Sequence, residues 1–172
     1  KDLGIWQTWT WADVAREVRA IALGLSKLGV KRGDTVAIAG NNRPRLYESI
    51  LAAQALGAIP VPVYADAVAT EMAYVLDHAD LGSMIADNEA SMAGDPEAAA
   101  RIDREIEAGS AADPSIILYT SGTTGRSKGV VLSAGRCIAA AQDTVTFDKL
   151  NADDVVLAYL PLAWVGDHYL NY

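Results

Sequence analysis

The chain has 172 residues, of which 51% are hydrophobic, so it can bury the core of one domain and is too apolar to be disordered. Its net charge of −8 argues against nonspecific binding of nucleic acid. A single cysteine excludes an internal disulfide and suits a reducing compartment, so we predict a cytoplasmic protein.

Helices and strands are expected to alternate along the first part of the chain. Thr10 begins a helix in which Asp13 closes a capping box, and Gly29 ends it. Further along, the pattern predicts strands over 36–39, 58–64 and 83–86, and helices from Pro44 to about Leu56, from Thr70 as cap to about Ala79, and over 96–109. This alternation indicates an α/β fold with mostly parallel sheets flanked by helices, in which ligands bind at the carboxyl ends of strands.

Two apolar features of this region have ordinary structural explanations. Trp6, Trp9 and Trp11 are expected to pack against the first helix. Residues 49–65 carry no charge, but this stretch is shorter than the ~20 residues that a membrane-spanning helix needs. Because it also contains Gly57 and prolines, we expect a buried helix followed by a buried strand, and no transmembrane segment.

The most informative segment is 119–130, which reads YTSGTTGRSKGV. Hydrophobic residues lead into it and out of it, so we expect a strand, a polar loop and a second strand. Glycines let a backbone approach a ligand closely, while N–H groups and hydroxyls bind phosphate oxygens. With Lys128 as a point charge, the segment predicts a phosphate-binding loop.

Two familiar phosphate-loop patterns fail on spacing. The pattern G-x-x-x-x-G-K-[ST], started at Gly122, requires glycine at Ser127 and a hydroxyl residue at Gly129. The pattern G-x-G-x-x-G starts at none of the loop glycines. A Ser/Gly-rich hairpin without a ligand is the remaining alternative, although such loops seldom place this run of hydroxyl residues ahead of a lysine.

The loop resembles the phosphate loop of the adenylate-forming enzymes, which include acyl-CoA synthetases, luciferases and the adenylation domains of peptide synthetases. Their pattern is [ST]-[ST]-G-[ST]-T-G-x-P-K-G, and it is matched at Thr120, Ser121, Gly122, Thr123, Thr124, Gly125, Lys128 and Gly129. Ser127 departs from the usual proline, which predicts a less rigid exit from the loop. Ala134 stands where many relatives have histidine.

The resemblance extends over nearly the whole chain. Residues 9–11, 33–34, 41–43, 57–64 and 71–78 are similar to the amino-terminal part of long-chain fatty-acid–CoA ligases. We therefore interpret residues 1–172 as an incomplete amino-terminal AMP-binding domain. The family has a longer segment between 88 and 110, and we favour the interpretation that residues are missing there over a truly short loop.

A second site is expected within 160–169, which resembles the second core motif of the family. Trp164 occupies the position of an aromatic residue that borders the acyl pocket, and an indole can wall an apolar tunnel. His168 could pair with a carboxylate or phosphate. Core packing is the alternative for Trp164 and a surface role the alternative for His168, whereas His78 is expected to be solvated and Cys137 to pack a helix. No spacing supports a zinc site.

The resemblance implies that a fatty acid attacks the α-phosphorus of ATP and that coenzyme A then displaces AMP. The ATP phosphates would be bound by the hydroxyls of the loop and Lys128, with Mg²⁺ sharing the charge, and Lys128 and Thr124 would be the catalytic residues. Peripheral contact with a membrane and the oligomeric state stay open.

Two motifs of such enzymes are absent from the sequence. Tyr-Gly-x-Thr-Glu has no match, and none of the six prolines lies in Pro-x-Gly-Lys. The adenine-motif region and the carboxyl-terminal domain are therefore not in this chain, which we predict to be inactive alone. Two alternatives remain: adenylation of another carboxylate, such as an aryl or amino acid, and a non-catalytic nucleotide- or partner-binding module.

Overall fold

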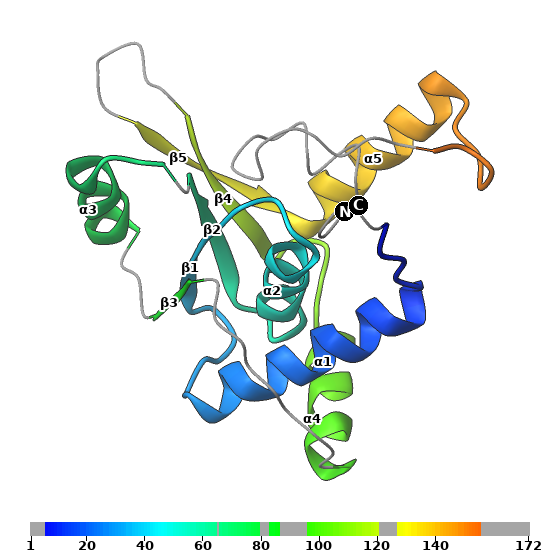
Figure 1. Ribbon diagram of the computed structural model, residues 1–172, viewed down its shortest axis with the longest axis horizontal. Coiled ribbons are helices and arrows are strands. Elements are labelled where there is room, and N and C mark those ends of the chain that lie inside the picture. Colours follow the sequence, from blue (N-terminus) through cyan, green and yellow to red (C-terminus); the bar gives the residue numbers. More distant parts are fainter. Residues whose placement is uncertain (1–5, 65, 80–82, 87–95, 121–126, 156–172) are drawn as a thin grey trace.

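The computed structural model describes residues 6–64, 66–79, 83–86, 96–120 and 127–155. Within these residues the chain forms a three-stranded parallel sheet and a two-stranded antiparallel sheet, with helices around them (Figure 1). The α/β fold with a parallel sheet flanked by helices is thus confirmed.

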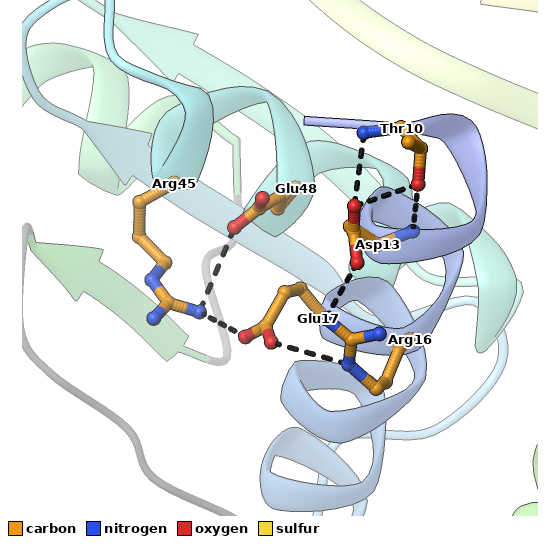
Figure 2. A network of polar contacts seen from close by, with 6 residues as sticks. All are labelled: Thr10, Asp13, Arg16, Glu17, Arg45 and Glu48. Carbon is orange, nitrogen blue, oxygen red and sulfur yellow. Dashed lines mark hydrogen bonds and ion pairs between the residues drawn. The ribbon is translucent and has the colours of Figure 1, made fainter. Parts of the chain in front are cut away.

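The first helix, α1 (Trp11–Lys27), begins as its sequence predicts. The backbone N–H of Asp13 donates to Oγ1 of Thr10 at 3.1 Å, and Oδ2 of Asp13 accepts from the backbone N–H of Thr10 at 3.0 Å (Figure 2). These reciprocal bonds form the expected capping box. The hydroxyl of Thr10 also donates to Oδ2 of Asp13 at 2.6 Å, and this bond is the main reason that the pKa of Asp13 falls to about 2. Gly29, with φ of +97°, follows the helix end.

The parallel sheet has the order β2-β1-β3, so its first strand is central. Two helices form the crossovers between its strands, and Pro44 occupies the first turn of one of them, where a missing N–H costs nothing. In chain order the elements are β1 (Thr35–Ala39), α2 (Pro44–Ala55), β2 (Ile59–Val63), α3 (Ala69–His78) and β3 (Ser83–Ala86).

Two prolines limit the sheet at β2. Pro60 and Pro62 pair with Val36 and Ile38 of β1, while the N–H of Ile59 donates to the carbonyl of Asp34 at 2.8 Å. Since N–H groups alternate in direction along a strand, the proline positions face the outer edge of β2, where prolines are tolerated. A further strand, β4 (Pro114–Thr120), lies beside this outer edge of β2 but pairs with β5 (Lys128–Ser133). The outer edge of β2 offers β4 no N–H group at positions 60 and 62.

The core lies between β1 and three helices, α1, α2 and α4 (Pro96–Glu107). Full burial of a large aliphatic side chain contributes roughly 1.5–3 kcal/mol. This sheet–helix contact therefore supplies much of the stability of the fold. The largest fully buried aliphatic side chains of this cluster are Val36, Ile38, Ile50 and Ile102.

Arg32 connects the turn before β1 to the end of α4 and the start of β4. Its Nη2 donates to the carbonyl of Glu105 at 2.6 Å, and its Nη1 donates to Oδ2 of Asp113 at 3.2 Å. Gly57 lies against this side chain with φ of +68°, and a Cβ there would be 2.5 Å from Nη1. Glycine at 57 thus satisfies both a left-handed backbone and a close approach.

The predicted cap of α3 is wrong. The helix begins at Ala69, with Val68 as N-cap and no side-chain capping bond, so Thr70 lies inside it. The N–H groups of Glu71 and Met72 donate to the carbonyl of Val68 at 2.9 and 3.0 Å, which starts the first turn before Thr70. A backbone carbonyl therefore replaces the hydroxyl that the sequence suggested.

The tryptophan prediction is also wrong, because Trp6 and Trp11 are 78% and 77% exposed. The buried residues of α1 lie in its carboxyl-terminal half, from Ile21 to Leu25, and its first turn extends past α2 (Figure 1). Helical periodicity identifies the apolar face of α1. How much of this face is buried depends on which other elements of the fold pack against it.

The uncharged stretch 49–65 forms most of α2 and then β2, which confirms the predicted buried helix and strand. In the part of the chain that the structure describes, every helix is too short or too polar to span a bilayer. The apolar run 155–159 also predicts a strand, but it lies outside the described residues except for Val155, which is exposed and belongs to no strand.

Candidate functional site

The predicted phosphate loop joins two strands, as the sequence indicates, and the structure shows that these strands are antiparallel. β4 pairs with β5 (Lys128–Ser133), and Thr120 opposite Lys128 is the last pair before the loop. The tip residues 121–126 lie outside the described part. The hairpin therefore fixes where the loop leaves the sheet and where it returns.

Thr120 and Lys128 are the two predicted phosphate-binding residues that the structure brings together. Residues directly opposite in an antiparallel pair have Cβ atoms about 4.5–5.5 Å apart on one face. Both residues are exposed, so a hydroxyl and an ammonium group stand together at the base of the loop. A hydroxyl donor and a cation at this spacing suit the oxygens of one phosphate group.

Gly129, next to Lys128, lies under an aromatic ring. It pairs with Tyr119, and a Cβ at 129 would be 3.2 Å from Cζ of Tyr119 and 3.2 Å from Cγ2 of Ile117. Any side chain at 129 would push these groups apart. The glycine thus allows the Tyr119 ring to pack across the hairpin immediately beside the Thr120–Lys128 pair.

Two side chains attach the hairpin to the rest of the fold. Nε2 of Gln54, on α2, donates to the carbonyl of Ser115 at 3.1 Å and to its Oγ at 3.0 Å. Oη of Tyr74, on α3, donates to the carbonyl of Ser127 at 3.1 Å. Neither contact could be predicted, since hydrophobic periodicity does not reveal partners 53 or 61 positions apart.

Helix α5 (Ala134–Asp148) follows β5 directly. The N–H of Ala134 donates to the carbonyl of Asp113 at 3.0 Å, and that of Gly135 donates to the carbonyl of Ala111 at 2.9 Å. A Cβ at 135 would lie 2.9 Å from that carbonyl oxygen, so glycine is needed for this approach. The start of α5 is therefore held at the end of the hairpin opposite the loop.

A cavity of about 790 Å³ lies between α5 and the beginning of β4, with Ile116 and Cys137 in its wall. Ser115 also lines it, about 17 Å along the strand from Thr120 at ~3.4 Å per residue. Burial raises the pKa of the Cys137 thiol. A protonated, half-buried thiol agrees with the predicted packing role of Cys137.

The other predicted site residues cannot be compared with the structure. They lie outside the described residues: Ser121, Gly122, Thr123, Thr124, Gly125, Trp164 and His168. Among the residues that are described, no group of three or more His, Cys, Asp or Glu side chains could hold a metal ion.

Comparison with known proteins places this geometry in a family. The AMP-binding enzyme family matches residues 2–172. The chain belongs to this family. The match includes the hairpin, the Thr120–Lys128 pair and the loop between them, so the resemblance of the loop reflects membership of the family.

Relatives support this assignment over most of the chain, and a solved structure shows the same fold. The long-chain-fatty-acid–CoA ligase FadD15 of Mycobacterium bovis is 30% identical over 196 residues, which cover 94% of this chain and 33% of that protein. Feruloyl-CoA synthase of an Amycolatopsis species is 30% identical over 167 residues, covering 89% and 34%. The fold resembles that of O-succinylbenzoate coenzyme A synthetase (MenE) from Bacillus subtilis in complex with AMP, with a TM-score of 0.75, 23% identity, and coverage of 91% and 44%. The chain thus spans about a third of the length of the curated relatives it matches.

Proposed function

We propose that this AMP-binding enzyme chain takes part in the ATP-dependent activation of a long-chain fatty acid. In the first step a carboxylate oxygen attacks the α-phosphorus of ATP, giving an acyl-adenylate and pyrophosphate. In the second step the thiol of coenzyme A attacks the acyl carbon, AMP leaves, and the thiol proton passes to solvent. As part of a longer protein, the chain would supply the phosphate loop for the first step.

The observation that carries this proposal is the pairing of Thr120 with Lys128 at the base of the loop. Negative charge grows on pyrophosphate as it leaves, and a cation and hydroxyl donors already in position stabilise that charge without reorganising. Ser121, Thr123 and Thr124 would add hydroxyls, and the glycines at 122 and 125 would allow close approach. In this scheme Lys128 and Thr124 are catalytic.

The choice of a long-chain fatty acid is supported by the ligase FadD15, whose match covers 94% of the chain. Trp164 and His168 are the proposed contacts of the acyl pocket. A fatty acid also suits peripheral contact with a membrane. A cytoplasmic location is supported by the single cysteine. Feruloyl-CoA synthase is similar to the same extent, so an aryl carboxylate is the leading alternative substrate.

Mg²⁺ belongs to the proposal only as a counter-ion of the ATP phosphates. The described residues include no cluster of ligands for it, so we assign it no protein ligand and no step. A non-catalytic module that binds a nucleotide or a protein partner is a second candidate.

Carboxylate-dependent exchange of pyrophosphate into ATP, measured with the full-length protein, tests the proposal. Acids of increasing chain length, together with ferulate and amino acids, should give exchange that rises with long-chain acids. A response confined to aryl or short acids would contradict the fatty-acid assignment. Exchange with no acid, despite binding of ATP, would favour the non-catalytic module.

A further inference from the structure

Tyr74 contacts the polypeptide at the point where the loop ends. Its hydroxyl, on α3, donates to the carbonyl oxygen of Ser127 at 3.1 Å in a partly buried position. Ser127 is the residue immediately before Lys128, which begins β5. α3 lies at the same end of the hairpin as the loop (Figure 1), so this bond connects the parallel-sheet unit to the exit of the loop.

The hydrogen bond from Tyr74 also restrains the backbone of Lys128, because the peptide unit between Ser127 and Lys128 is planar. The carbonyl of Ser127 and the N–H of Lys128 belong to one planar group, so holding the oxygen also holds the nitrogen and the direction of the Cα of Lys128. Serine at 127 leaves φ free, unlike a proline. The bond from Tyr74 therefore restrains the backbone at Ser127, where a proline would have fixed φ and a serine does not.

The other side of the hairpin supports the same segment. Cζ of Tyr119 would lie 3.2 Å from a Cβ at Gly129, so this ring packs on the residue after Lys128. Burial raises the pKa of Tyr119, and the nearby Tyr74 hydroxyl raises it further, so the two phenols lie close together. Residues 127–129 are thus contacted by Tyr74 at one end and Tyr119 at the other.

We propose that Tyr74 is a positioning residue for Lys128: through its bond to the Ser127 carbonyl it holds the Lys128 backbone so that the ammonium group stands beside the Thr120 hydroxyl. The inference rests on the proposed function, in which Lys128 binds the phosphates of ATP. Tyr74 touches no substrate in this scheme. Its removal should therefore weaken the use of ATP and leave the use of the carboxylate unchanged.

The test is a double-mutant cycle of Tyr74→Phe with Lys128→Ala in the full-length protein. Tyr74→Phe keeps the ring and removes only the hydroxyl. The loss of one hydrogen bond should raise the KM for ATP about 2- to 10-fold, with the KM for the carboxylate unchanged. In the Lys128→Ala background, Tyr74→Phe should have no further effect on ATP binding. Thr144→Val is the matched control, because it removes a hydroxyl that donates to the carbonyl of Ala140 at 2.9 Å on α5.

Amide hydrogen exchange separates failure of this inference from failure of the proposed function. Tyr74→Phe should speed the exchange of peptides that contain residues 127–129, whether or not Lys128 binds ATP. Unchanged exchange, or an equal loss of ATP binding with and without Lys128, would overturn the positioning role. Faster exchange together with a Lys128→Ala protein that binds ATP normally would instead contradict the proposed function.

Discussion

Arg45 bridges two helices by holding the carboxylates of Glu17 and Glu48. Its Nη1 is 3.1 Å from Oε2 of Glu17 on α1 and 3.6 Å from Oε2 of Glu48 on α2 (Figure 2). Glu48 is only 4% exposed, and burial raises its pKa more than the charge of Arg45 lowers it. Ionising Glu48 therefore requires more free energy in the folded protein than in the unfolded chain, which lowers the stability of the fold.

The pH dependence of this cost has a definite sign. Well below the ordinary glutamate pKa of 4.5, Glu48 is protonated in both states and imposes no penalty. As the pH rises above 4.5 the penalty appears, and it is complete once the pH exceeds the raised pKa of the folded state. Glu48→Gln should thus raise the Tm at neutral pH and leave it nearly unchanged at about pH 3.

Thermal unfolding of Glu48→Gln and the wild type across this pH range measures the effect. Glu17→Gln is the control, because Glu17 shares Arg45 but is partly exposed. It should lower stability by no more than about 1 kcal/mol, the usual worth of an exposed ion pair. A Glu48→Gln protein that is less stable than the wild type at neutral pH would show that the attraction to Arg45 outweighs burial.

Lys128→Ala should impair the use of ATP while the fold stays intact. Lys128 is exposed at the first position of β5, so its side chain contributes little to the core. Losing one charge-assisted contact of about 1.5–3 kcal/mol corresponds to roughly a 10- to 150-fold fall in kcat/KM for ATP. Pyrophosphate exchange at varied ATP concentration gives this ratio.

Lys31→Ala is the matched control for that variant, since Lys31 is also exposed and lies in the turn before β1. Its backbone N–H, and not its side chain, donates to Asp34 at 3.0 Å. Equal activity of the Lys128→Ala and wild-type proteins would remove Lys128 from the proposed site.

Features set by residues close together in the sequence could be predicted. The capping box uses Thr10 and Asp13, three positions apart, and the hairpin needs only two strands and the loop between them. The two expected strands on either side of the loop are β4 and β5, and their pairing, with Thr120 opposite Lys128, came from the structure. The position of Thr70 shows the limit, because the helix began at a backbone carbonyl that no side-chain signal marks.

Contacts between distant segments could not be predicted. Tyr74 bonds to a carbonyl 53 residues away, and nothing in its own helix distinguishes it from a packing tyrosine. The exposure of Trp11 was missed for a related reason, since burial depends on which elements lie opposite. The contacts that hold the candidate site in place thus required the structure, while the candidate residues themselves are a prediction from the sequence of the loop.

Thr10→Ala should destabilise the fold by about 1 kcal/mol, the usual cost of losing a helix N-cap. Thr10→Ser keeps a hydroxyl and should stay close to the wild type. Chemical denaturation measures both. A loss equal in the two variants would mean that the methyl group, and not the hydroxyl bond to Asp13, carries the effect.

The same variant should change the acid sensitivity of the protein. The pKa of Asp13 is lowered to about 2 from 3.8, chiefly by the side-chain bond from Thr10. The contribution of ionised Asp13 is present above 3.8 and is lost as the pH falls towards 2. Without the hydroxyl of Thr10, this acid-dependent loss should be smaller.

Gly57→Ala should cost more stability than Gly33→Ala, although both glycines have a positive φ, of +68° and +85°. A Cβ at 33 meets nothing within 4 Å, so that variant measures the backbone cost alone, about 1–2 kcal/mol. A Cβ at 57 would in addition displace Arg32, whose Nη1 lies 2.5 Å from it. Arg32 would then lose its bond to the carbonyl of Glu105, an extra cost of about 1 kcal/mol.

Denaturation of the two glycine variants in an Arg32→Ala background isolates this extra cost. With the arginine side chain removed, Gly57→Ala and Gly33→Ala should destabilise the protein equally, because only the left-handed backbone remains to be strained. A difference that persists without Arg32 would mean that the backbone at 57 is held more rigidly than at 33. Arg32 would then not be the reason that glycine is needed at 57.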